Sequence, residues 1–284
     1  MTDGPRMLVI DTAYTHKMMV ERKLSELVTS RDLGGYFDHI WACHPFATLF
    51  EPAESPERNG PPTSYHFAAA HTLIEGRIGR FRWLTALPFL NFLVAQVGVL
   101  RRLVALVRRE RIDLIRCEDP LYNGLLGLLI ARLCRKPLII GVWGNPGAIR
   151  QSNGQPLMPR LFRKIRVEEA VERFVLRRAD LVLAQNEDNR GFILSKGVPR
   201  EKTEIFRLGN ALNGIHFSDP AEREDGRPML AELGISNDPT LLVIARLYEP
   251  KLIQDVIRAV RLLKDRGRRV TLLLAGEGPY TNLH

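Results

Sequence analysis

Short apolar runs alternate with longer helical patterns along most of the chain, and this alternation constrains the fold more than any other feature. Strands rich in Val, Ile and Leu are predicted at residues 7–11, 39–42, 112–117, 138–142, 181–184 and 204–206. Helices are predicted at residues 17–29, 84–109, 121–134 and 159–178, with loops at 50–64 and 144–156. Strands that alternate with helices of about ten residues or more form βαβ units. The chain is therefore predicted to be α/β, with a mostly parallel sheet.

A charged, turn-rich stretch at residues 219–239 divides this pattern in two and is predicted to be a linker. Residues 1–218 before it are predicted to form one Rossmann-like domain. Residues 240–284 after it hold a strand, a helix at 252–266 and a second strand, which make a single βαβ unit. Such a unit leaves a two-stranded sheet that cannot bury its faces. We therefore expect a second Rossmann-like domain that is incomplete here and continues beyond His284.

The balance of charges favours an anionic partner. Lys and Arg number 41 against 32 Asp and Glu, a formal net charge of +9, and arginines gather at residues 101–116 and 160–166. Nucleotide phosphates, a membrane surface or nucleic acid could supply the anion, and a merely solvated basic face is an equal alternative. No helix-turn-helix, zinc module or aromatic stacking motif supports nucleic acid, so no nucleic-acid partner is expected.

Cysteine spacing and the first residues indicate a cytoplasmic protein. Cys43, Cys117 and Cys134 lack the spacing of a disulfide framework or a zinc site, and no acidic pair has metal-ligand character. We expect neither a metal nor a cofactor. The first residues lack the pattern of a signal peptide. The apolar stretch at residues 83–100 is interrupted by a proline and two amides. It is predicted to be a buried or interfacial helix, and a peripheral contact with the inner membrane surface stays open.

Two loops at the carboxyl ends of the last two predicted strands carry the strongest chemical signals. Arg246 and Lys251 lie in the segment Ala-Arg-Leu-Tyr-Glu-Pro-Lys, between a strand and the helix that follows. A guanidinium fork and an ammonium beside helix N–H groups suit a diphosphate, although a solvated loop would also explain them. The next strand ends in Gly276, Glu277 and Gly278. Glycines there permit the close approach of a ligand to the backbone, or form an ordinary turn.

Taken together, the order of these motifs resembles the GT-B glycosyltransferases of family 4. The pattern [A/G]RL-x(3)-K, a helix and LLLAGEGP is similar to the start of that family's nucleotide-binding domain. Upstream, residues 178–184 (RADLVLA) look like the family's R-x-A-D-x-V-x-A strand. Residues 213–217 (NGIHF) look like its N-G-[VI]-D-x-F crossover, with His216 in place of Asp. Residues 111–120 resemble its R-P-D-[VL]-[IV]-x…P region.

The resemblance implies a GT-B fold with two Rossmann-like domains and a retaining transferase that uses a nucleotide sugar. By this resemblance, Arg246 and Lys251 bind the donor diphosphate and stabilise the leaving nucleoside diphosphate. Gly276, Glu277 and Gly278 form the donor nucleotide loop. The implied partners are a nucleotide-sugar donor and a glycan, lipid-linked or small-molecule acceptor, and no metal is required.

The chain departs from the family pattern on the acceptor side. The segment Thr-Ala-Tyr-Thr follows the first strand, where the family places glycines, and Trp143 stands where many members carry a histidine. Trp143 cannot replace the proton chemistry of histidine, although it or Asn145 is a weak candidate for contact with the acceptor. Glu118 and Asp119, at a strand end, are weak candidates too. Asp119 as a helix N-cap, with Pro120 at the first helical position, explains that pair better.

The sequence is compatible with two functions. The first is a glycosyltransferase of which this chain is an N-terminal portion. The second is a truncated, non-catalytic remnant that binds a glycan or a partner, suggested by Trp143 and by the expected incompleteness of the second domain. The family's E-x7-E segment, which contacts the donor sugar and ribose, is expected beyond His284, so the sequence assigns no catalytic residue.

Overall fold

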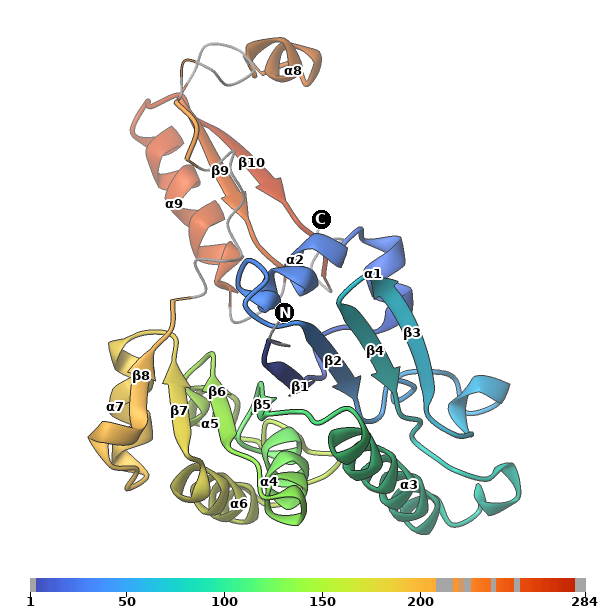
Figure 1. Cartoon of the computed structure of the whole chain (residues 1–284). Helices are drawn as coiled ribbons and strands as arrows, with labels where there is room; N and C mark the ends of the chain where they lie inside the picture. Colours follow the sequence, from blue (N-terminus) through green and yellow to red (C-terminus); the bar gives the residue numbers. More distant parts are fainter. Residues whose placement is uncertain are drawn as a thin grey trace. The chain divides into compact units, whose positions relative to one another are not determined.

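The computed structural model describes residues 4–207, 217–219, 221, 226–235, 239–247 and 251–278. Figure 1 follows the chain through two units, Met1–Asn213 and Gly214–His284. The predicted linker at 219–239 falls within the second unit. Three sequence motifs lie at least partly outside the described residues: the crossover at 213–217, the middle of the first donor loop at 248–250, and the proline that ends the second donor loop.

The first unit is built on an eight-stranded sheet of order β3-β4-β2-β1-β5-β6-β7-β8. Neighbouring strands are parallel except β3 and β4, which pair antiparallel at one edge. The strands are β1 (Arg6–Ile10), β2 (His39–His44), β3 (Thr63–Ala68), β4 (His71–Glu75), β5 (Leu114–Cys117), β6 (Leu138–Val142), β7 (Leu181–Ala184) and β8 (Thr203–Ile205). The predicted α/β class with a mostly parallel sheet is thus confirmed.

Helices cover both faces of this sheet. On one face, α4 (Tyr122–Cys134) packs against both α3 (Pro88–Arg109) and α6 (Ile165–Arg178), as the layer in Figure 1 shows. Leu8 and Ile10 of β1 belong to the large core on one face, whereas Met7 and Val9 belong to a smaller core, because successive strand residues point to opposite faces. The remaining elements are α1 (His16–Glu21), α2 (Ser25–Thr29), α5 (Pro146–Asn153) and α7 (Glu187–Ser195), and the 3-10 turns η1 (Ser30–Asp32), η2 (Pro56–Arg58), η3 (Arg82–Leu84) and η4 (Arg200–Lys202).

Several elements differ from the sequence-based expectation. The hairpin β3–β4 and the helix α7 were not predicted, and the helix predicted at 17–29 is divided into α1 and α2. The loop predicted at 144–156 contains α5. Its polar residues are caps: the Asn145 side chain accepts a hydrogen bond from the Ala148 N–H at 3.1 Å, and Pro146 occupies the first turn. Gly154, at φ 65°, ends the helix.

The second unit has a two-stranded parallel sheet of β9 (Thr240–Ile244) and β10 (Thr271–Ala275), joined by α9 (Ile253–Asp265). A short helix, α8 (Arg227–Glu232), precedes it. Among the described residues of this unit, Ile253 is the one buried hydrophobic side chain, and Ile244 is 76% exposed. The exposed strands agree with the expectation that one βαβ unit cannot cover its own sheet.

Candidate functional site

The strand order of the first unit reverses at β1, which lies between β2 and β5. In open parallel sheets, ligands bind at the carboxyl ends of the strands beside such a switch point. The acceptor-side candidates predicted from the sequence follow two strands on one side of it. Glu118 and Asp119 come directly after β5, and Trp143 and Asn145 follow β6. The structure gives these four residues different roles.

Glu118 and Trp143 are brought together. The Trp143 indole Nε1 donates to Glu118 Oε2 at 2.5 Å, and Arg116 Nε lies 2.9 Å from Glu118 Oε1. The Arg116 guanidinium also lies over the Trp143 ring, 5.6 Å from its centroid, and over the ring of Phe206 at 5.4 Å. The Glu118 carboxylate is therefore fixed between a cation and an N–H donor, and the two aromatic rings flank that cation. A fixed carboxylate beside an aromatic face is well suited to bind sugar hydroxyl groups.

Arg116 and Phe206 are site residues that the sequence analysis missed. Arg116 was grouped with the basic cluster at residues 101–116, yet it is 7% exposed. The signal that could have found it is a charged residue inside an otherwise apolar strand, because a buried charge requires a partner. Phe206, beyond the end of β8, carries no comparable signal.

A second ion pair lies at the end of β1. Arg31 Nη2 is 2.5 Å from Asp11 Oδ2, and both side chains are largely buried. Asp11 Oδ1 accepts the Ala13 N–H at 2.8 Å, which shapes the turn that replaces the family's glycines. Burial opposes the charge of Arg31, but the carboxylates of Asp11 and Glu118 outweigh it, so the pKa of Arg31 is raised. The two ion pairs therefore interact across the carboxyl ends of β1 and β5.

Asp119 has mainly a structural role. Its Oδ1 accepts the Leu121 N–H at 2.8 Å, and its Oδ2 accepts a hydrogen bond from Asn123 Nδ2. The predicted N-cap is wrong in detail, because α4 begins at Tyr122 with Leu121 as its N-cap, which places Pro120 before the helix. Burial raises the pKa of Asp119 to about 7.

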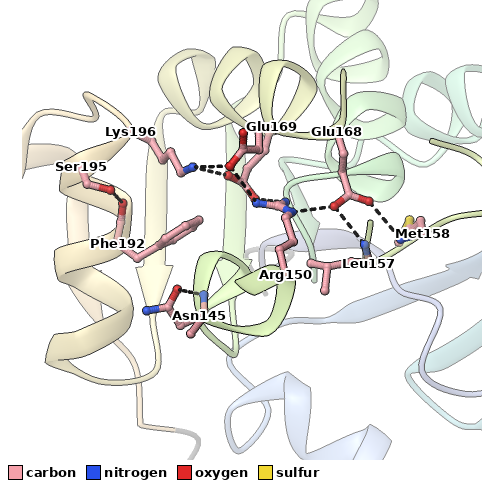
Figure 2. A network of polar contacts seen from close by, with 11 residues as sticks. Asn145, Arg150, Leu157, Met158, Glu168, Glu169, Phe192, Ser195 and Lys196 are labelled. Carbon is pink, nitrogen blue, oxygen red and sulfur yellow. Dashed lines mark hydrogen bonds and ion pairs between the residues drawn. The ribbon is translucent and has the colours of Figure 1, made fainter. Parts of the chain in front are cut away.

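Asn145 also has a structural role, since its Oδ1 caps α5 and its Nδ2 donates to Asp188 Oδ2 at 3.0 Å. Figure 2 shows the buried network behind it. Arg150 on α5 binds Glu168 at 2.7 Å and Glu172 at 2.5 Å, both on α6. Glu168 in turn accepts the N–H groups of Leu157 and Met158, at 3.0 and 2.9 Å. The network therefore fixes α5 and the segment after it against α6.

The two donor loops meet within the second unit. The Leu247 N–H donates to the Glu277 carbonyl at 2.9 Å, and the Ala245 N–H donates to the Ala275 carbonyl at 3.1 Å. A Cβ atom at Gly276 would collide with the Ala245 carbonyl, and one at Gly278 with the Leu247 carbonyl. The glycines are therefore required by backbone–backbone approach, a reason that the sequence analysis did not consider.

Lys251 lies beside the N-terminus of α9, a helix of 13 residues. The N-cap residue is Leu252, whose side chain makes no capping hydrogen bond. Leu252 has φ 51°, which is uncommon for a non-glycine residue, and such strain often gathers at ligand sites. Arg246 lies in the same loop, which joins β9 to α9, between Ala245 and Leu247. Both predicted diphosphate contacts thus belong to the same end of the β9–α9–β10 unit.

Comparison with known families decides the classification. A model of the glycosyl transferase 4-like domain matches residues 51–209, which is more than half of the 284-residue chain. The chain belongs to this glycosyltransferase family. The resemblance inferred from the sequence is confirmed. No curated protein matches the chain.

Solved structures support the GT-B fold of this glycosyl transferase 4-like chain. HepE of Anabaena, in complex with UDP and glucose, has a TM-score of 0.60 at 18% identity, with 98% of this chain and 62% of that one covered. An E. coli trehalose-6-phosphate structure bound with UDP-2-fluoro glucose has a TM-score of 0.57 at 12% identity, with 97% and 65% covered. A trehalose-6-phosphate synthase, studied for glycosyltransfer with retention, has a TM-score of 0.52 at 16% identity, with 98% and 65% covered. The chain thus spans less than two thirds of the length of each of these proteins.

Proposed function

We propose that this glycosyl transferase 4-like chain takes part in the transfer of a sugar from a UDP-sugar to an acceptor, with retention at the anomeric carbon. The observation that carries the proposal is the joining of the two donor loops, with Arg246 and Lys251 at one end of the β9–α9–β10 unit beside a helix N-terminus. UDP or a UDP-sugar is bound in two of the three compared structures, and retention is studied in the third. The protein would act in the cytoplasm.

In this proposal the second unit binds the leaving group, the nucleoside diphosphate. As the bond between the sugar and the diphosphate breaks, negative charge grows on the diphosphate. Fixed cations and helix N–H groups stabilise that charge without reorganisation. Arg246 would supply a planar fork and Lys251 a point charge. Glu277, on the facing loop, is proposed to contact the nucleotide.

The acceptor would bind at the switch point of the first unit. Glu118 is held in place by Arg116 and Trp143. It can therefore accept a hydrogen bond from an acceptor hydroxyl without a further loss of side-chain entropy. Trp143 would offer an aromatic face to a sugar ring. Asn145 and Asp119 are not included, because their side chains cap or close local turns.

Calorimetric titration of the chain with UDP and UDP-glucose tests the donor half. Arg246→Ala and Lys251→Ala are each expected to weaken binding about tenfold or more, because a hydrogen bond to a charged group contributes about 1.5–3 kcal/mol. Lys264→Ala, at the other end of α9, is the matched control and should bind as the wild type does. Equal binding by all four proteins would reject the donor site.

A non-catalytic binding role is the second candidate. The observation that favours it is the bond between Trp143 and Glu118 at the position where many family members carry a histidine. Release of UDP from UDP-glucose by the protein, measured with and without candidate acceptors, separates the two. Turnover that depends on Lys251 excludes the non-catalytic role, and tight glycan binding without any turnover supports it.

A further inference from the structure

An apolar groove in the first unit leads to the candidate acceptor site. It consists of two adjoining cavities of about 570 and 420 Å³, which share the lining residues Phe46, Leu49, Phe50, Arg160 and Leu161. The smaller cavity also reaches Thr12, after β1, and His44, at the end of β2. The groove therefore begins at the switch point where Asp11 and Glu118 lie. Neither of the proposed sugar-binding roles uses it.

The other end of the groove opens beside an exposed apolar surface. The larger cavity is lined there by Pro88, Phe89 and Phe92 at the start of α3. Phe89 is 73% exposed, and Trp83 on η3 is 76% exposed. Further exposed side chains in this region are Phe81, Leu87, Leu90, Leu93 and Val97. This array, with Phe50, Trp83 and Phe89, is called the apolar face. So large an exposed array indicates a surface that a partner covers.

One side of the helix α3 is buried in the first unit, and its other side forms part of the apolar face. It is long and apolar enough to cross a membrane by length and composition alone. However, Ala95, Val99 and Leu103 on one side of it are buried in the unit, whereas Phe89, Leu93 and Val97 on the other side are exposed. The spacing of four residues in each set is that of one helix face. A helix held in the core by one face can present its other face to the surface of a bilayer.

Charge indicates which partner fits the groove. Its wall carries three arginines, Arg58, Arg160 and Arg163, against one carboxylate, Glu51. The Arg160 guanidinium lies over the ring of Phe50, 5.3 Å from its centroid, where the two cavities join. Apolar walls with a cation at their junction match an amphiphile that has a hydrocarbon tail and an anionic head.

We propose that the apolar groove binds a lipid-linked acceptor, with its hydrocarbon tail along Phe89 and Phe50 and its phosphate head at Arg160. The acceptor group beyond the phosphate would then lie toward Thr12 and Glu118. The apolar face would contact the membrane from which the lipid is taken. This inference rests on the proposed function for its meaning in catalysis, but lipid binding itself requires no donor.

The proposed membrane contact does not involve the basic cluster at residues 101–116, for which the sequence analysis considered a membrane surface among the anionic partners. Arg102 donates to the Pro62 carbonyl and to Ser64 Oγ, both at 2.8 Å, and Arg108 donates to the Leu133 carbonyl at 3.2 Å. These arginines bind other parts of the first unit. We therefore place the proposed membrane contact at the first half of α3.

Calorimetry with three small probes tests the groove: dodecyl phosphate below its micelle concentration, dodecyl maltoside and inorganic phosphate. We expect the wild type to bind dodecyl phosphate at least about tenfold more tightly than the other two probes. Phe89→Ser should weaken dodecyl phosphate binding about tenfold, because burial of a phenylalanine side chain is lost. Arg160→Gln should remove the preference for the phosphate head. Val20→Ser, at a residue that is 64% exposed on α1, and Arg173→Gln, on α6, are the matched controls.

Flotation with phosphatidylcholine vesicles, with and without phosphatidylglycerol, tests the apolar face. Phe89→Ser and Trp83→Ser should reduce the bound fraction, and Val20→Ser should not. If Phe89→Ser loses vesicle binding but keeps wild-type affinity for dodecyl phosphate, the groove is not the lipid site and the proposal fails. Absence of binding to every amphiphile also overturns it and leaves the apolar face to a protein partner. UDP binding is measured separately, so failure of the donor site and failure of the groove can be told apart.

Discussion

Loss of Arg150 is predicted to destabilise the first unit strongly. It is 3% exposed, and it neutralises two carboxylates, Glu168 and Glu172, that are fully buried. Arg150→Met keeps an apolar stem of similar reach but leaves both carboxylates without their guanidinium. Lys196 remains, at 3.2 Å from Glu172, and cannot reach both. Removing one partner of a buried ion pair costs about 3–5 kcal/mol. Because Arg150 pairs with two carboxylates, we expect a loss of stability at the upper end of this range, about 5 kcal/mol.

Urea unfolding followed by circular dichroism measures this loss. Arg173→Met, at an exposed position of α6, the helix that carries Glu168 and Glu172, should change stability by less than about 0.5 kcal/mol. A penalty below about 1 kcal/mol would refute the reasoning.

Three further predictions concern single residues. The wild type should lose stability as pH rises from 3.8, the ordinary pKa of an aspartate, to about 7, the pKa of Asp119 in the folded protein, and Asp119→Asn should remove this loss. Urea midpoints of the two proteins should differ above that range and converge below it. Trp143→Phe should cost about 1–3 kcal/mol in thermal unfolding, because Glu118 Oε2 loses its indole donor, and no change would mean that the bond contributes nothing. Gly276→Ala should speed hydrogen exchange at the Leu247 amide, because the added Cβ pushes the two donor loops apart; unchanged protection would show that the loops tolerate a side chain there.

The central strands were the easiest elements to predict. The ranges 138–142 and 181–184 are confirmed to the residue by β6 and β7, because parallel strands that are covered on both faces read as continuous apolar runs. The hairpin β3–β4 was not predicted because its sequence includes several polar residues. Of these, Thr72 lies 3.0 Å from both His39 and His66, and Glu75 accepts the N–H of His16 at 2.6 Å. His39 and His16 come from elements outside the hairpin, so the strand pattern alone could not show that these polar residues of β4 would be buried.

The candidate site was predictable only where its residues follow a strand directly. Glu118 was selected for that reason, whereas Trp143 was selected because it stands where many family members carry a histidine. The bond between them joins residues 25 apart in the chain. The pair of Asp11 and Arg31 depends on the position of η1, which no local pattern indicates. Asn145 and its neighbours in α5 were misread because caps and turns use the same residue types, and a short helix between them has little apolar periodicity.

The exposed strands β9 and β10 have a consequence for synthesis. During translation the eight strands of the first unit emerge before them, and domains generally fold as units in the order in which they are made. The first unit could therefore be folded when Leu241, Leu242 and Ile244 leave the ribosome with their side chains uncovered. Strand edges and apolar faces of this kind pair readily with other nascent chains. These two strands are therefore the part of the second unit most prone to pair with another chain during synthesis.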